Sequence, residues 1–189
     1  LMIDGEERFF EIDVLPLGDS HDKNTEMLKS IRDVTEERKI QEQLIYLATT
    51  DSLSGLYNRA EFMRLAHKEF ETAKKNNEEM SLLIMDLDHF KAVNDTFGHA
   101  AGDAIIQEMG SIIKTSFRKT DIPGRIGGEE FAVVLKNASS AEAEVVAEQV
   151  REIIESKRVI YGKHEIRFTV SIGVAALRHG GESIGDIEE

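Results

Sequence analysis

Hydrophobic residues recur at helical and strand periods along most of the chain. Three segments place them three or four positions apart, which is typical of one buried face of a helix. The three faces are Phe62, Leu65, Ala66 and Phe70; Ile105, Ile106, Met109, Ile112 and Ile113; and Val146, Val150, Ile153 and Ile154. Strands are predicted where apolar residues run together or alternate. These segments are SLLIMDLD at 81–88, a short stretch at 124–126, Glu130 to Lys136, and the alternating set Ile166, Phe168, Val170, Ile172 and Val174.

From residue 81 the predicted order is strand, helix, strand, strand, helix, strand, with a glycine pair at 127–128 as the turn of the central hairpin. This order predicts the α+β class and a ferredoxin-like βαββαβ core of the palm type. A right-handed crossover makes the first two strands parallel, and the third lies antiparallel between them. The end of the first strand, with Asp86 and Asp88, is therefore expected at the same edge of the sheet as Glu129 and Glu130.

The first 50 residues predict different elements. Residues 6–17 alternate imperfectly, contain Pro16 and lead into the turn-like GDSHDKN, as at the end of a β-rich domain. A helix is predicted over 35–50, with Thr35 as its N-cap. Its apolar stripe fits either a coiled-coil seam or a single amphipathic connector. The stripe consists of Ile40, Leu44 and Leu47.

The composition narrows the classes of function. The formal net charge of -13 argues against a surface that follows nucleic-acid phosphates, because such binding uses clustered Lys and Arg. A polyphosphate ligand would need a metal ion to offset the repulsion. The chain has no cysteine, which excludes disulfides and thiolate chemistry and favours the cytoplasm, and its six histidines form no close zinc-binding pair. No apolar stretch approaches the roughly 20 residues that span a bilayer, so no membrane contact is expected.

Asp86 interrupts an otherwise apolar strand and is a candidate for chemistry. A buried carboxylate is costly unless it is paired or binds a metal, and the predicted topology supplies Glu129 as its partner. Two convergent carboxylates at a wet sheet edge form a hard-oxygen site suited to Mg²⁺. The alternative is that the glycine pair is an ordinary tight turn and the acidic residues are solvated edge charges.

Three blocks resemble the GGDEF family of diguanylate cyclases. GRIGGEEF at 124–131 is similar to the family signature in its GGEEF form. DSLSGLYNR at 51–59 resembles the opening motif D-x-L-T-G-L-x-N-R, with Ser54 in place of Thr, and MDLDHFKAVNDTFGHAAGD at 85–103 is the third match. The resemblance implies a nucleotidyltransferase that joins two GTP molecules into cyclic di-GMP, a bacterial second messenger, as a homodimer.

The resemblance also implies a domain organisation. Residues 1–34 are similar to the C-terminal remnant of a PAS-like sensor domain, and DVTEERK at 33–39 resembles the junction that follows such domains. Residues 35–50 would be a signalling helix and 51–189 the catalytic domain. Family members continue into a last helix whose Lys and Arg hold the triphosphate, and the chain ends at GESIGDIEE without it. Weak activity or inactivity is therefore expected of this chain.

By the same resemblance, Mg²⁺ or Mn²⁺ would be held by the side chains of Asp86 and Glu129 and by the carbonyl of Leu87. Glu129 and Glu130 would be catalytic, Glu129 being the candidate base. The implied substrate-binding residues are Asn94 and Asp103 for guanine and, for the phosphates, Lys91 with the backbone around His89 and Phe90. A solvated Lys91, or a helix-capping Asp103, is the alternative. Gly98 and Gly102 are expected in a loop close to the ligand.

Arg118 and Asp121 form an R-x-x-D motif five residues before the signature glycines. Its spacing resembles the family's inhibitory site for the product, and the alternative is a polar helix end. Three rival functions are a catalytically degenerate module that binds GTP or cyclic di-GMP, a dimerisation module, and a palm domain acting on nucleic acid. The intact GGEEF sequence and the acidic charge favour the cyclase.

Overall fold

Residues 2–3, 6–17 and 26–177 are described by the computed structural model, and they belong to two units divided between Ala48 and Thr49. The predicted turn GDSHDKN and the C-terminal GESIGDIEE lie outside the described residues. No helix in the described ranges is both long enough and apolar enough to cross a membrane.

The first unit consists of β-ribbons and a helix. Strands β1 (Met2–Ile3) and β2 (Glu6–Glu7) pair, as do β3 (Phe10–Leu17) and β4 (Glu26–Asp33), both antiparallel. Helix α1 (Thr35–Thr49) follows directly. Thr35 is not its N-cap as predicted. The carboxylate of Asp33 accepts the N–H of Thr35 at 3.0 Å, while the Thr35 hydroxyl accepts the N–H of Phe9 at 2.9 Å.

The apolar stripe of α1 is exposed. Ile40, Leu44 and Leu47 have exposed fractions of 56%, 61% and 62%. Large apolar side chains at regular spacing are normally covered by another element, so this helix offers a surface for a partner.

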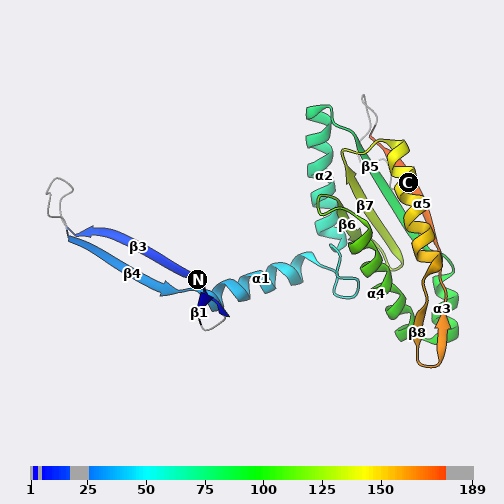
Figure 1. Ribbon diagram of the computed structural model, residues 1–189, viewed down its shortest axis with the longest axis horizontal. Coiled ribbons are helices and arrows are strands. Elements are labelled where there is room, and N and C mark those ends of the chain that lie inside the picture. The colour runs from blue at the N-terminus through cyan, green and yellow to red at the C-terminus, as the bar shows by residue number, and fades with distance from the viewer. Residues whose placement is uncertain (1, 4–5, 18–25, 178–189) are drawn as a thin grey trace. The chain divides into compact units, whose positions relative to one another are not determined.

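The second unit is built on a four-stranded sheet with the order β10-β5-β7-β6 (Figure 1). Its strands are β5 (Met80–Leu87), β6 (Ile122–Arg125), β7 (Glu130–Lys136) and β10 (Val170–Ala176). All neighbouring strands are antiparallel, so β5 and β6 run parallel with β7 between them. The predicted strand directions and the α+β class are confirmed.

Helices cover the two faces of this sheet unequally (Figure 1). Helix α2 (Arg59–Asn76) packs on one face through Phe62, Ala66 and Phe70, which belong to one hydrophobic cluster with Ala132 and Val134 of β7. Helices α4 (His99–Ser116) and α5 (Ser140–Ser156) bury the other face. All five residues of the predicted α4 face are buried: Ile105, Ile106, Met109, Ile112 and Ile113.

The prediction for α5 is wrong at Ile153, which is 40% exposed. The buried stripe of α5 runs instead through two alanines, Ala143 and Ala147, and then Val150 and Ile154. Ile153 lies about 100° around the helix from Ile154 and faces outward. The small alanines carry little hydrophobic signal, although they occupy the face that packs closest to the sheet.

Two further elements were not predicted. Residues 89–98 contain the helix α3 (Phe90–Phe97), and a small hairpin is formed by β8 (Val159–Tyr161) and β9 (His164–Ile166). The predicted last strand is therefore divided, because Ile166 belongs to β9 and the sheet strand starts at Val170. Burial still alternates across the break, which explains why the pattern resembled one strand.

Candidate active site

The candidate site lies where β5 ends beside the turn between β6 and β7. Asp86 is paired with Glu130 in the β5–β7 register. The N–H of Leu87 donates to the carbonyl of Glu129 at 3.3 Å. The structure thus brings Asp86, Leu87 and Glu129 to one edge of the sheet.

Asp86 is exposed, and the expectation that it is buried is wrong. Along β5, Leu83, Met85 and Leu87 are buried against α4 and α5, whereas Asp86 belongs to the opposite face. Helix α2 covers that face mainly over β6 and β7. The carboxylate of Asp86 therefore remains hydrated and needs no buried partner.

The signature turn folds back on itself. The N–H groups of Ile126 and Gly127 both donate to the carbonyl of Glu130, at 2.9 and 3.3 Å. A Cβ placed on Gly127 would lie 2.0 Å from Oε2 of Glu130. A side chain at 127 would thus displace the Glu130 carboxylate. Glu129 is half-buried and Glu130 is exposed.

Arg125 is a site residue that the sequence reasoning missed. Its Nη1 donates to both carboxylate oxygens of Asp51, at 3.1 and 3.2 Å, and its Nε and Nη2 donate to the carbonyl of Gly128, at 3.2 and 2.7 Å. Asp51 and Arg125 each belong to one of the motifs noted in the sequence. Their opposite charges were the only sequence feature that could have suggested an ion pair between these motifs.

Asp51 is held in turn by Ser54, whose N–H and hydroxyl each donate to Oδ1 at 2.8 Å. Burial raises the pKa of Asp51, but the bonds from Ser54 and Arg125 outweigh it and keep that pKa below its ordinary value. Asp51 is therefore ionised at neutral pH.

The two predicted guanine-reading residues are on α3 and α4. Oδ1 of Asn94 is buried and has no hydrogen-bond partner among the described residues. It lies against Gly102, where an added Cβ would be 2.1 Å away. Asp103 follows Gly102 and is exposed. An unsatisfied buried acceptor beside an exposed carboxylate is an arrangement that a ligand with N–H groups can complete.

Gly98 and Gly102 are required for structural reasons that differ from the predicted loop beside the ligand. Gly98 joins α3 to α4 with φ of 85°, a conformation that favours glycine. Gly102 lies inside α4 rather than in a loop, and its missing side chain lets Asn94 and Phe90 pack closely. The capping alternative for Asp103 is not observed, since the first turn of α4 holds no acidic residue.

The predicted phosphate-binding residues start α3. His89 precedes the helix with φ of 57°, Phe90 packs into the core, and Lys91 is exposed. Beside them, Asp88 accepts the hydroxyls of Thr169 and Ser171, both at 2.6 Å. The bond from Ser171 has the larger effect and that from Thr169 the next, and together they lower the pKa of Asp88. They also connect the start of β10 to the end of β5.

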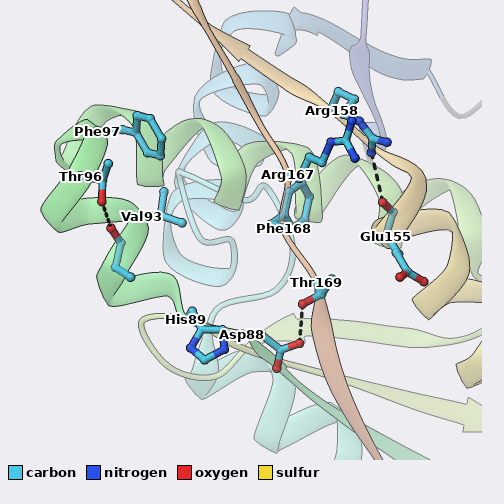
Figure 2. A pocket seen from close by; sticks show the side chains of 11 residues that line it. Asp88, His89, Val93, Thr96, Phe97, Glu155, Arg158, Arg167, Phe168 and Thr169 are labelled. Atoms are coloured by element: carbon cyan, nitrogen blue, oxygen red, sulfur yellow. Dashed lines mark hydrogen bonds between the residues drawn. The ribbon is translucent and has the colours of Figure 1, made fainter.

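A cavity of about 580 Å³ lies on another side of α3 (Figure 2). Val93 and Phe97 form one wall, and Arg167 and Phe168 form part of the other. Of the predicted substrate-binding residues it includes only His89.

The predicted inhibitory motif forms a tight turn. The carboxylate of Asp121 accepts the N–H of Arg118 at 3.0 Å and the N–H of Lys136 at 3.4 Å. The Asp121 side chain is largely buried, whereas Arg118 is exposed. Asp121 therefore supports the turn and β7, and Arg118 is the member that faces solvent.

The described residues contain no group of three or more His, Asp or Glu side chains arranged for a metal ion. The end of β5 and the adjacent turn instead offer two carboxylates, those of Asp86 and Glu129. The backbone of Leu87, the last residue of β5, lies between them and bonds to Glu129. This hard-oxygen set fits Mg²⁺, which commonly takes one or two carboxylates and completes its shell with water and substrate phosphates.

Comparisons with known proteins identify similar chains. The family model described as diguanylate cyclase, GGDEF domain, matches residues 48–188. Diguanylate cyclase A of Treponema denticola is 39% identical over 150 residues, which cover 78% of this chain and 40% of that protein. The chain thus spans less than half the length of this curated relative.

Solved structures of similar fold carry the same domain name. The coiled coil and GGDEF domain of DgcB from Caulobacter crescentus, in complex with c-di-GMP, matches with a TM-score of 0.73 and 29% identity, covering 78% of this chain and 79% of that one. The active GGEEF domain of a diguanylate cyclase from Vibrio cholerae matches with a TM-score of 0.63 and 30% identity, covering 68% and 81%.

Proposed function

This chain belongs to the family of diguanylate cyclase GGDEF domains, and from that membership we propose that the protein condenses two GTP molecules into cyclic di-GMP where β5 ends beside the β6–β7 turn. The bond from the Leu87 N–H to the Glu129 carbonyl is the observation that carries the proposal. It joins the strand bearing one acidic residue to the turn bearing the other, so that both flank the same space.

Asp86, Glu129 and the Leu87 carbonyl hold Mg²⁺ or Mn²⁺ in this proposal. A metal held there would polarise the α-phosphate and lower the pKa of the attacking 3′-hydroxyl. Glu129 would take the proton from that hydroxyl as its oxygen attacks the α-phosphate and displaces pyrophosphate, and Glu130 would add negative charge beside the metal. Lys91 and the backbone at the start of α3 position the phosphates, which offsets part of the repulsion from an acidic protein.

Guanine is selected by Asn94 and Asp103. The carboxylate of Asp103 accepts from N1–H and the exocyclic amine of guanine, a pair of donors that adenine does not present. The Asn94 side chain turns toward the entering base, so that its Oδ1, which is buried and unsatisfied among the described residues, gains a donor.

The product has two-fold symmetry, so two catalytic domains must face one another with one GTP each. The exposed stripe of α1, formed by Ile40, Leu44 and Leu47, supports pairing of two copies through this helix. The β3–β4 ribbon is then the end of a PAS-like sensor whose state sets that pairing.

Arg118 and Asp121 form the product-inhibition site. Exposed Arg118 offers two parallel N–H donors to a phosphate or a guanine edge. Both oxygens of Asp121 already accept backbone N–H groups, so any bond from the ligand would use the remaining lone pairs of the carboxylate.

The test is to incubate the protein with GTP and Mg²⁺ and to separate the nucleotides by chromatography. Wild type should release cyclic di-GMP. Glu129→Gln should retain less than a tenth of the rate, about 1.4 kcal/mol of barrier, while its unfolding midpoint stays unchanged. Since weak activity is expected of this chain by itself, the refuting result is GTP binding without any product by the folded full-length protein, which would leave a binding module.

A further inference from the structure

Arg125 connects two segments that are far apart in the sequence. Its guanidinium meets Asp51 on one side and the Gly128 carbonyl on the other through the four contacts given above. Its side chain is only 14% exposed, and that of Asp51 is 24% exposed. Water therefore screens this ion pair less than a surface pair, and its geometry is better defined.

The orientation of the Gly128 carbonyl depends on its hydrogen bonds with Arg125. No atom lies within 4 Å of the position that a Cβ on Gly128 would take and the residue is exposed, so packing restrains it little. The turn is closed by two hydrogen bonds from the N–H groups of Ile126 and Gly127 to the Glu130 carbonyl. Neither of them involves the Gly128 carbonyl. That carbonyl belongs to the planar peptide linking Gly128 to Glu129, so its direction fixes one end of the Glu129 backbone.

Asp51 is a firm anchor for Arg125. Its N–H donates to the carbonyl of Leu56 and its own carbonyl accepts the N–H of Gly55, both at 2.8 Å. With the two bonds from Ser54, the carboxylate is fixed from both its backbone and its side chain. Arg125 thus transfers the position of the 51–56 loop to the signature turn.

We propose that Arg125, held by Asp51, is a positioning residue that orients the Gly128–Glu129 peptide and thereby the Glu129 carboxylate toward its metal. The catalytic consequence rests on the proposed function, but the orientation is measurable on the metal alone. Lysine cannot replace arginine here, because a single ammonium cannot bridge the Asp51 carboxylate and the Gly128 carbonyl with the same fixed fork.

The experiment compares wild type, Arg125→Lys, Asp51→Asn and the control Arg64→Gln. Arg64 is a matched control because it also pairs with a carboxylate, Glu61, but it is 61% exposed on α2. Mn²⁺ is titrated without nucleotide, and paramagnetic broadening of the amide signals of residues 127–130 gives the binding midpoint. The turnover number, the KM for GTP and the unfolding midpoint are measured on the same samples.

Arg125→Lys should raise the Mn²⁺ midpoint at least fivefold and lower the turnover number at least tenfold, with KM within twofold. Asp51→Asn should move both quantities in the same direction by less, since Arg125 still reaches Gly128. Arg64→Gln should match wild type. An unchanged Mn²⁺ midpoint in folded Arg125→Lys overturns the positioning role. If the full-length protein makes no cyclic di-GMP, the proposed function fails, while the Mn²⁺ midpoints still decide the role of Arg125. If Arg125→Lys does not fold, Asp51→Asn decides it.

Discussion

Gly102→Ala should weaken GTP binding while leaving the stability of the domain almost unchanged. The new Cβ would lie 2.1 Å from Oδ1 of Asn94 and 3.0 Å from the Phe90 ring, so Asn94 must move. Overpacking of this kind costs about 1–3 kcal/mol. Its lower end applies because the end of a flexible side chain can yield, and alanine gains about 1 kcal/mol over glycine inside a helix. The two effects nearly cancel in the free energy of unfolding.

The displaced Asn94 can no longer accept from guanine. A lost hydrogen bond of about 0.5–1.5 kcal/mol corresponds to a roughly two- to tenfold weaker affinity for GTP. Isothermal titration with a non-hydrolysable GTP analogue measures this affinity, and urea denaturation measures the stability.

Gly110→Ala is the matched control in the same helix. Its Cβ would lie 2.2 Å from the carbonyl oxygen of Ser54, which is backbone and cannot rotate away. This variant should lose about 1–2 kcal/mol of stability after the same helical gain is subtracted. Undiminished GTP affinity in Gly102→Ala, or equal destabilisation of the two variants, would refute this reasoning.

Four further outcomes are expected. Asp103→Ser should reduce the preference for GTP over ATP in a competition assay, because one hydroxyl cannot accept from both guanine donors. Arg118→Ala should keep the initial rate but abolish the slowing by added cyclic di-GMP, and equal inhibition of wild type and variant in progress curves would exclude this site. Leu44→Pro should lower the rate most at low protein concentration, whereas a concentration-independent effect would argue against pairing through α1. Burial raises the pKa of Asp51, but the bonds from Ser54 and Arg125 lower it further, so the folded-state pKa lies below its ordinary value. The contribution of Asp51 to stability is therefore full at neutral pH and is lost as pH falls through the lowered pKa. Denaturation of Asp51→Asn should differ from wild type at pH 7 and converge with it in acid.

The periodic pattern predicted the core elements because burial on one face repeats with the geometry of the element itself. The α4 face is buried as expected, and so are Leu83, Met85 and Leu87 of β5, whereas Leu82 and Ile84 on its other face are only partly buried. The handedness of crossovers fixes the strand order, so the sequence alone predicts that the end of β5 meets the turn between β6 and β7. α3 was missed because its eight residues are too short for several helical repeats.

The sequence by itself determined which residue types stand at the sheet edge, since motif spacing and strand alternation are local properties of the chain. Only the tertiary structure decided that Asp86 is hydrated, because this depends on how far α2 extends across the sheet. It alone placed Arg125 between Asp51 and Gly128, because an ion pair across 74 residues has no periodic signal. It also explained Gly102 by the close packing of α3 on α4, a contact that no spacing within one helix can reveal.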